Sequence, residues 1–357
     1  MKWFCKMVLV WTLLVGTVQS GAVYAAGNAA GGLPADLVKV PEWPVNMTLQ
    51  DGHLLLSDSP ETVPADGITY QDTVNGSVRL FFHHVNGTTE RKKIVVVLAN
   101  NTNTAARVTV SRHGIAGPSA DYLAVGKEAQ REYLAGNNLY LLDVPAHGTA
   151  LLAPVLNVVS VGPNMLLNGI YDFQTDRPLT VKVMMMPLAA DVEETAAKLK
   201  ILPADQYKLR GTFAGPDRLL IPEKVYDAVE DGPVALTLAD NKIDVYQKGT
   251  DATDGSTTVN YGNYGVVYHL YIPSMHSGKL QVYLNPLGGE FAGAMGVKYR
   301  YVSKAPCPVP DNRLFFGRGP QPQLSPIGTF DGGQSLWLTF SPPGASNLPV
   351  RLLILPK

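Results

Sequence analysis

The chain has 357 residues, and its 29 Lys and Arg against 30 Asp and Glu give a formal net charge of −1. Hydrophobic residues make up 46% of it and charged residues 17%, with 34 glycines and 27 prolines. This composition excludes a disordered polymer, a coiled coil and a collagen-like fibre, and it is typical of a turn-rich β protein. The balanced charge argues against nucleic acid as a partner, because such binding needs a concentrated basic surface.

The N-terminus carries the pattern of an export signal. Two lysines within the first six residues precede the uncharged, mostly apolar run 7–18, and Val23 and Ala25 stand at the −3 and −1 positions of a signal-peptidase site. A helix of that run spans about 18 Å, which is short of the ~30 Å hydrocarbon core of a bilayer. We therefore expect a signal peptide over residues 1–25, a secreted or cell-envelope-associated protein, and no transmembrane anchor after signal removal.

Strand patterns begin after the Gly/Ala/Pro-rich residues 26–44, which predict a flexible N-terminal arm. Residues 78–83 and 107–111 alternate with a period of two, whereas 94–98 is apolar on both faces and predicts a central strand. Short strands separated by polar turns are typical of an immunoglobulin-like sandwich. We therefore expect a first β-sandwich domain over residues 45–188.

Two segments carry helical signals. Residues 122–134 place apolar side chains at helical spacing and are followed by Gly136, which suits a C-cap. Residues 189–203 predict a short helical linker, in which Asp191 is the N-cap and Glu194 occupies the capping-box position.

Beyond this linker the strand patterns resume and predict a second β-sandwich domain over residues 204–357. Residues 234–238 and 243–246 flank a polar turn, which predicts a β-hairpin. The expected fold class is all-β, with two tandem immunoglobulin-like sandwiches and one or two short helices. After signal removal Cys307 is the single cysteine, so no intrachain disulfide can form and the fold must depend on core burial.

Six segments carry a resemblance to known sequences. They are GITYQDTV at 67–74, RLFFHHVNGT at 79–88, GPSADYL at 117–123, LRGTF at 209–213, DATDG at 251–255 and NYGV at 263–266. Together they resemble exported proteins of Gram-positive, spore-forming lineages that carry a copper amine oxidase N-terminal-like, or stalk, domain. The resemblance covers about residues 45–357, without the stalk domain itself. It implies a cell-envelope setting and no particular activity.

One short motif bears on copper chemistry. Residues 257–261, TTVNY, are similar to the motif in which copper amine oxidases convert a tyrosine to a quinone, but Gly262 replaces the acidic last residue. Copper in these enzymes needs two histidines one residue apart and a third further on. Here His83 and His84 are adjacent, and on a strand they point to opposite faces. A copper/quinone oxidase-like or glycan-acting enzyme is therefore the last of our alternatives.

An oxygen-rich stretch is the one candidate for a metal ion. Asp240, Asp244, Asp251 and Asp254 could supply carboxylate oxygens to Ca²⁺, and no other cofactor is expected. Their spacing departs from that of an EF-hand. We favour the alternative that these side chains bond to nearby backbone N–H groups in Asx-turns.

A group of tyrosines is the candidate ligand site. Tyr261, Tyr264, Tyr268 and Tyr271 could form a platform on which sugar rings stack, although the alternation favours core packing with exposure at the edge. We predict a secreted, non-enzymatic envelope or extracellular-matrix module with a binding or structural role. Its partner would be a cell-surface polysaccharide or an envelope protein, and a polysaccharide-binding module is the first alternative.

Overall fold

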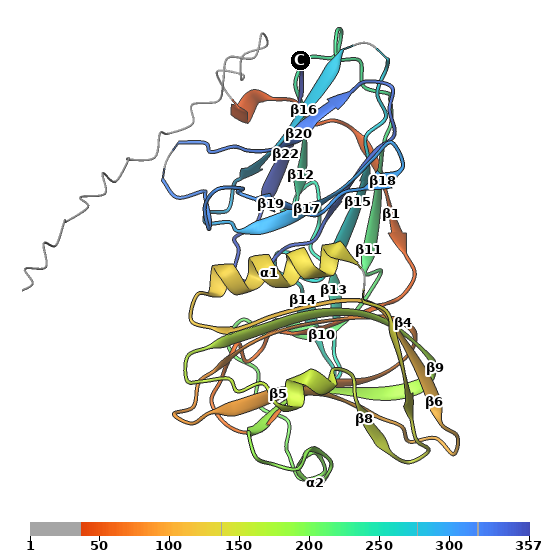
Figure 1. Ribbon diagram of the computed structural model, residues 1–357, viewed down its shortest axis with the longest axis vertical. Coiled ribbons are helices and arrows are strands. Elements are labelled where there is room, and N and C mark those ends of the chain that lie inside the picture. The colour runs from red at the N-terminus through yellow and green to blue at the C-terminus, as the bar shows by residue number, and fades with distance from the viewer. Residues whose placement is uncertain (1–36, 137, 277, 320) are drawn as a thin grey trace, which may run out of the picture.

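The computed structural model describes residues 37–136, 138–276, 278–319 and 321–357, which form mainly β-strands (Figure 1). The predicted signal peptide, 1–25, and residues 26–36 of the predicted arm lie outside the described residues. The prediction of an all-β sandwich fold is confirmed. Among the described residues, no helix has the length and apolar character that a membrane crossing requires.

The upper module in Figure 1 is a sandwich of a seven-stranded and a four-stranded sheet. The larger sheet has the order β1-β11-β15-β21-β17-β18, with β19 paired to β17, and the smaller has the order β12-β22-β16-β20. Side chains from both sheets meet in one apolar core. The strands of the larger sheet are β1 (Val45–Gln50), β11 (Asp217–Pro222), β15 (Val267–Tyr271), β17 (Gly293–Tyr299), β18 (Val302–Ser303), β19 (Cys307–Val309) and β21 (Leu336–Phe340). Those of the smaller sheet are β12 (Val234–Leu238), β16 (Lys279–Pro286), β20 (Ser325–Asp331) and β22 (Val350–Pro356).

The lower module is one eleven-stranded sheet that supplies two layers (Figure 1). Its main path is β14-β13-β10-β2-β4-β9-β5-β8, with β3 paired to β4, β6 to β9 and β7 to β6. The long strands β4 and β9 pair antiparallel with two register shifts, and such bulges bend a strand. The strands are β2 (His53–Ser57), β3 (Thr62–Val63), β4 (Gly67–Asn86), β5 (Lys92–Ala99), β6 (Ala106–Ser119), β7 (Tyr140–Val144), β8 (Thr149–Leu151), β9 (Leu166–Pro187), β10 (Arg210–Ala214), β13 (Lys248–Asp251) and β14 (Ser256–Val259).

Strands that precede the predicted linker, 189–203, pair with strands that follow it, and this occurs in both modules. β1 precedes it but pairs with β11 of the upper module, whereas β10 follows it but pairs with β2 of the lower module. Val40 and Trp43, from the end of the predicted arm, are buried against the upper module. Each module therefore contains chain from both sides of the linker.

The layer formed by β2, β4 and β9 is buried on both faces. In β2, Leu54 and Leu56 belong to the core shared with the upper module, whereas Leu55 between them belongs to the core of the lower module. In β4, Phe81 faces the upper module, and Leu80 faces the lower core. The two modules are therefore packed together by apolar side chains, and not joined only by covalent connections.

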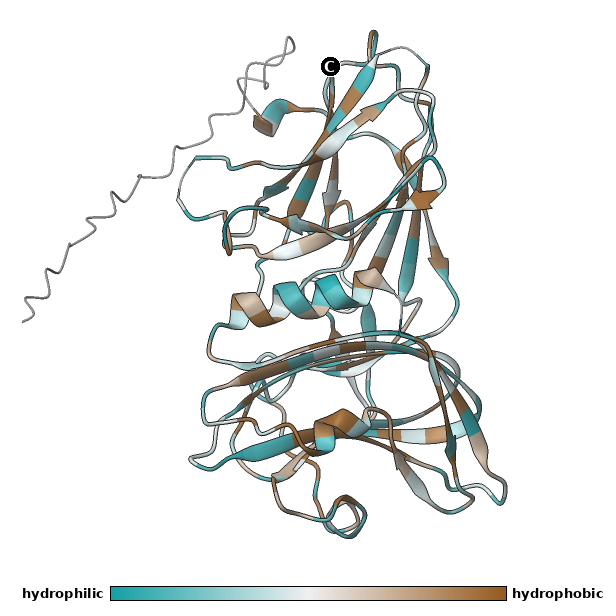
Figure 2. Cartoon of the chain, viewed as in Figure 1, coloured by the Kyte–Doolittle hydropathy of each residue, from teal (hydrophilic) through white to brown (hydrophobic). Residues whose placement is uncertain are grey.

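Both predicted helices are confirmed. α1 (Tyr122–Ala135) lies between the modules and shows alternating hydrophilic and hydrophobic turns (Figures 1 and 2). It ends at Gly136, whose φ of 67° is in the left-handed region that favours glycine. α2 (Val192–Ala196) starts after Asp191, whose side chain accepts a hydrogen bond from the backbone N–H of Glu194. Two short 3₁₀ helices, η1 (Leu37–Lys39) and η2 (Pro154–Asn157), complete the elements.

The predicted hairpin of 234–238 with 243–246 is wrong. β12 pairs instead with β22, and residues 243–246 form no strand. The carboxylate of Asp240 accepts three backbone N–H groups of the turn, and Ala239 and Asn241 have positive φ. This capped turn directs the chain away from β12.

The packing of α1 yields a test of how the modules dock. A Cβ added at Gly126 would lie 1.8 Å from the carbonyl oxygen of Gly344 in the upper module. Gly126→Ala should therefore lower the free energy of unfolding by about 1–3 kcal/mol, although alanine favours a helix. Urea denaturation measures this value. The control is Glu128→Ala on the exposed side of α1, for which we expect a change within ~0.5 kcal/mol. A stabilised Gly126→Ala protein would contradict this contact.

Candidate functional site

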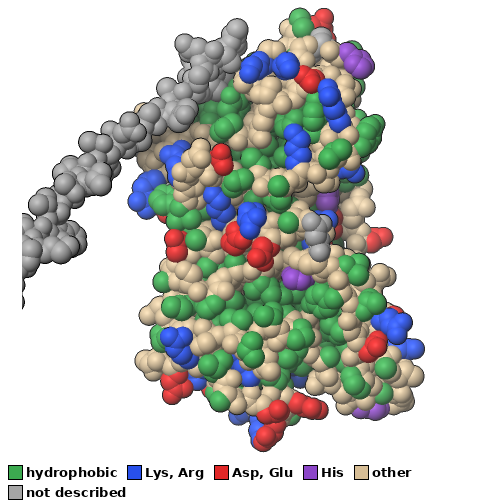
Figure 3. Space-filling model, viewed as in Figure 1, with side chains coloured by type: hydrophobic (Ala, Val, Ile, Leu, Met, Phe, Trp, Pro, Cys, Tyr) green, Lys and Arg blue, Asp and Glu red, His purple; other side chains and the backbone are tan. Residues whose placement is uncertain are grey.

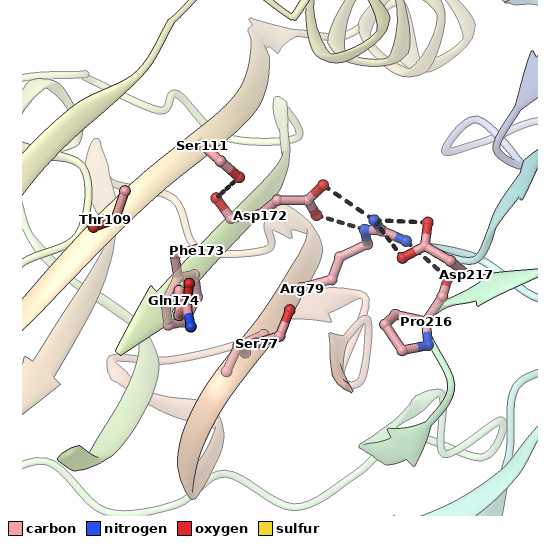
Figure 4. A pocket seen from close by; sticks show the side chains of 10 residues that line it. Ser77, Arg79, Thr109, Ser111, Asp172, Phe173, Gln174, Pro216 and Asp217 are labelled. Carbon is pink, nitrogen blue, oxygen red and sulfur yellow. Dashed lines mark hydrogen bonds and ion pairs between the residues drawn. The ribbon is translucent and has the colours of Figure 1, made fainter. Parts of the chain in front are cut away.

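A cleft of about 520 Å³ opens where the modules meet. Strands from both modules line it, and it adjoins a smaller cavity of about 180 Å³ with which it shares Arg79, Ser111, Asp172 and Asp217 (Figure 4). Its lining residues are Gln50, Arg79, Ser111, Arg112, Asp172, Asp217, Leu219, His269 and Trp337. Binding sites often form at such junctions, because two modules together supply concave walls.

Arg79 of β4 is the central charge of this cleft. Its side chain is 5% exposed and points toward two carboxylates (Figure 4). Its Nε and Nη2 donate to Asp172 of β9 over 2.6 and 3.0 Å, and Nη2 also lies 3.2 Å from Asp217 of β11. Nη1 donates to the backbone carbonyl of Pro216 over 2.7 Å. Arg79 therefore joins the lower module to the upper one through charge-assisted hydrogen bonds.

Asp172 is further held by α1. The hydroxyl of Tyr133 donates to its carboxylate over 2.6 Å, and the ring of Tyr133 is fully buried. The guanidinium carbons of Arg79 and Arg112 lie 5.7 and 5.2 Å from the centre of that ring. Tyr133 therefore anchors the carboxylate and packs against both cations.

Asp217 pairs with a second partner in the upper module. Nε2 of His269 on β15 lies 3.0 Å from its carboxylate. Burial works to raise the pKa of Asp217, but the hydrogen bond from His269 and the charge of Arg79 outweigh it and leave this pKa below its usual value. The carboxylate is therefore ionised at neutral pH.

An aromatic platform continues from the cleft onto the outer face of the seven-stranded sheet. Trp337 of β21 lines the cleft, and Tyr271 of β15 is its cross-strand partner. The two rings are partly exposed, with centres 4.8 Å apart and planes tilted by 32°. Flat, exposed aromatic rings on a rigid sheet suit the apolar face of a sugar.

The structure separates the four tyrosines that the sequence singled out. Tyr271 belongs to the platform just described. Tyr268 is buried and donates to Asp244 over 2.6 Å, and Tyr264 donates to the backbone carbonyl of Ser346. Tyr261 is 54% exposed and contacts the ring of Tyr246 edge-on. The four side chains therefore do not form one surface.

The four candidate metal ligands have protein partners and lie in two separate turns. Asp240 accepts backbone N–H groups in its own turn, and Asp244 is paired with Arg218. Asp251 pairs with Arg210 over 2.7 Å, and Asp254 accepts the backbone N–H of Ser256. Across the described parts of the chain, no group of three or more His, Cys, Asp or Glu side chains could hold a metal ion.

The copper motif likewise lacks a ligand set. The described residues do not fit the copper site of an amine oxidase, because His83 and His84 are buried with different surroundings. His84 bonds to Ser57 over 2.8 Å and to the backbone carbonyl of Pro60 over 3.0 Å. His83 stacks on Phe81.

Around these histidines lies a second buried polar cluster. Burial, and then the charge of His84, lowers the pKa of His83 to about 3, and burial lowers that of His84 to about 4. Burial raises the pKa of Asp58 well above its usual value, with further contributions from Glu61 and Asp205. The cluster is therefore built to hold neutral histidines.

Sequence reasoning missed Arg79, Asp172, Asp217 and Trp337. The alternation of Leu336, Leu338 and Phe340 does place Trp337 on the opposite face of its strand, and this signal could have found it. No comparable signal pointed to Arg79, because its burial depends on the second module.

Comparison with known proteins does not assign the chain to a family. No family model matches the chain, and no curated protein matches it. The CUB1-EGF-CUB2 domains of rat MASP-1 are 11% identical, with 85% of this chain and 96% of that chain covered and a TM-score of 0.20. Lactobacillus farciminis oxalate decarboxylase in its formate complex is 10% identical, with 87% and 83% covered and a TM-score of 0.15. Likeness at this level carries no argument about this chain.

The Arg79 network predicts a large loss of stability on its removal. Arg79→Met keeps the apolar stem but leaves Asp172 and Asp217 without their shared cation, so the free energy of unfolding should fall by about 3 kcal/mol. Urea denaturation measures it. Arg107→Met is the matched control, because its pair with Asp143 is about two-thirds exposed on both sides and should cost at most ~1 kcal/mol. Equal losses in the two variants would refute a central role for Arg79.

The buried histidines predict a pH dependence. Because the folded pKa values lie below the ~6.5 of an unfolded histidine, the unfolded chain binds more protons between these values. The contribution of these histidines to the free energy of unfolding should therefore fall as the pH drops from 7 to 4, whereas the raised pKa of Asp58 acts in the opposite direction. His83→Gln should flatten this fall by up to about one proton's slope in denaturation curves taken at several pH values. His147→Gln, at an exposed position, is the control measured in the same way. A variant at His83 with the wild-type slope would contradict the prediction.

Proposed function

We propose that this protein is a secreted, non-enzymatic module of the cell envelope or extracellular matrix that binds polysaccharide at the cleft and aromatic platform. The observation that carries the proposal is the pair Tyr271 and Trp337, which is partly exposed on a sheet and continuous with a cleft. The proposal combines the preferred prediction from the sequence, an envelope or matrix module, with its first alternative, a polysaccharide-binding module. The export signal in the sequence supports the location.

The form of the cleft supports a saccharide over a flat protein partner. It is a concave space of about 520 Å³ with polar groups on its walls and an aromatic ring at its edge. Gln50 and His269 contribute amide and imidazole groups that can bond to hydroxyls. Stacking on one ring face with hydrogen bonds around the rim matches the amphipathic shape of a sugar.

The carboxylates of the cleft support binding without hydrolysis. Glycoside hydrolysis needs one carboxylic acid whose raised pKa keeps it protonated. Asp217 has a lowered pKa, and the oxygens of Asp172 accept hydrogen bonds from Arg79 and Tyr133. Neither group is placed to donate a proton to a glycosidic oxygen.

The test is retention by polysaccharides. Affinity electrophoresis of the mature chain through neutral and acidic soluble polysaccharides should show retention by at least one of them. Trp337→Ala should weaken that affinity about 10- to 30-fold, because a central aromatic anchor is worth roughly 2 kcal/mol. Tyr261→Ala, which removes an exposed tyrosine from the loop outside the cleft lining, is the control and should bind as wild type does. No retention by any polymer, or loss in the control alone, would overturn the proposal.

A further inference from the structure

We infer that the bound polysaccharide is acidic, with a sugar ring on Trp337, a sugar carboxylate on Arg112, and a neighbouring anionic unit facing Lys298. This inference rests on the proposed function and deepens it by naming the ligand class. It comes from two basic side chains that flank the tryptophan, one in the cleft and one on the sheet.

Arg112 is the guanidinium of the cleft that the fold leaves without an acceptor. It lies opposite Asp172 in the pairing of β6 with β9, next to a register shift that follows Val110. Such a bulge redirects side chains. Asp172, however, is already bonded to Arg79 and Tyr133. Within the described residues the guanidinium of Arg112 makes no hydrogen bond or ion pair, and its carbon lies 5.2 Å from the centre of the Tyr133 ring.

Lys298 lies on the other side of the tryptophan. The pairing of β17 with β21 sets Lys298 directly opposite Trp337, and that of β15 with β21 sets Tyr271 opposite it. Directly opposed residues share a face of the sheet, so Tyr271, Trp337 and Lys298 form a row. Lys298 is exposed and has no ion pair among the described residues.

The two carboxylates of the cleft are directed at partners within the protein. Arg79 is shared between Asp172 and Asp217, the hydroxyl of Tyr133 also donates to Asp172, and Nε2 of His269 lies 3.0 Å from Asp217. Their oxygens therefore face protein donors. Arg112 presents a planar fork of N–H donors, which matches a carboxylate in two parallel hydrogen bonds. A neutral sugar would leave this charge without a partner.

On Figure 3, hydrophobic side chains gather across the middle of the lower module, with charged groups at its margins. Nothing in the described part of the chain indicates what would cover this surface. The cleft, in contrast, combines a concave shape with the guanidinium of Arg112 and the ring of Trp337.

The test compares each acidic polymer with its own neutral form. Alginate, polygalacturonate and hyaluronate are used as such and after reduction of their carboxylates to alcohols, which keeps the sugar backbone. At low salt the wild-type chain should bind at least one acidic form about tenfold or more tightly than its reduced form. Rising NaCl should reduce this preference, since exposed charges are screened.

Variants assign the preference to the two cations. Arg112→Gln should lose most of the preference, and a far-UV circular dichroism spectrum like that of the wild type shows that the variant is folded. Lys298→Gln should lose a smaller part. Arg107→Gln, an exposed arginine of the same strand, is the matched control and should keep the preference. Equal binding of acidic and reduced polymers by the wild type, with loss of both in Trp337→Ala, would overturn this inference and leave the proposed function standing. Absence of binding to every polymer would overturn both.

Discussion

A sheet layer buried on both faces is the constraint on which the rest of this structure depends. Leu54, Leu55 and Leu56 follow one another in β2 and enter two different cores, so the strand has no solvent face. In most antiparallel sheets one face is wet and can carry charges freely. Here any charge on the upper face of this layer must find partners within the layer or in the module above it.

Arg79 meets that requirement. It stands beside Phe81 in β4 with its side chain toward the upper module, and it takes acceptors from both modules: Asp172 below, Asp217 and the carbonyl of Pro216 above. Apolar packing alone tolerates sliding between surfaces, whereas a buried guanidinium with directed donors has few alternative positions. The network therefore fixes how β11 and β15 lie over β9, and that arrangement sets the walls of the cleft.

Much of this fold could be predicted locally, but its pairings could not. The spacing of 122–134 and the following Gly136 gave α1, because helix periodicity and capping are local properties. The pairing of β1 with β11 joins residues about 170 positions apart, and no local pattern encodes that choice. The prediction of a hairpin at 234–246 was wrong. Residues 243–246 have strand propensity, but the turn built on Asp240 and the ion pair of Asp244 with Arg218 hold them outside any strand.

The same distinction explains the candidate site. Tyr271 could be named as a candidate because an aromatic residue in a strand pattern is recognisable in the sequence. Its place in a platform, however, depends on Trp337, which lies more than sixty residues away in the chain and opposite it in the sheet. Charged residues of the site are harder to predict, because the sequence does not reveal which carboxylate a lysine or arginine contacts in the folded chain. In the folded chain Arg79, Arg210 and Arg218 form ion pairs with largely buried carboxylates. Arg112 and Lys298 form no ion pair among the described residues. Because Tyr271 and Trp337 stand on paired strands and their rings contact each other, the rings are positioned before any ligand arrives, and little ordering cost opposes stacking on them.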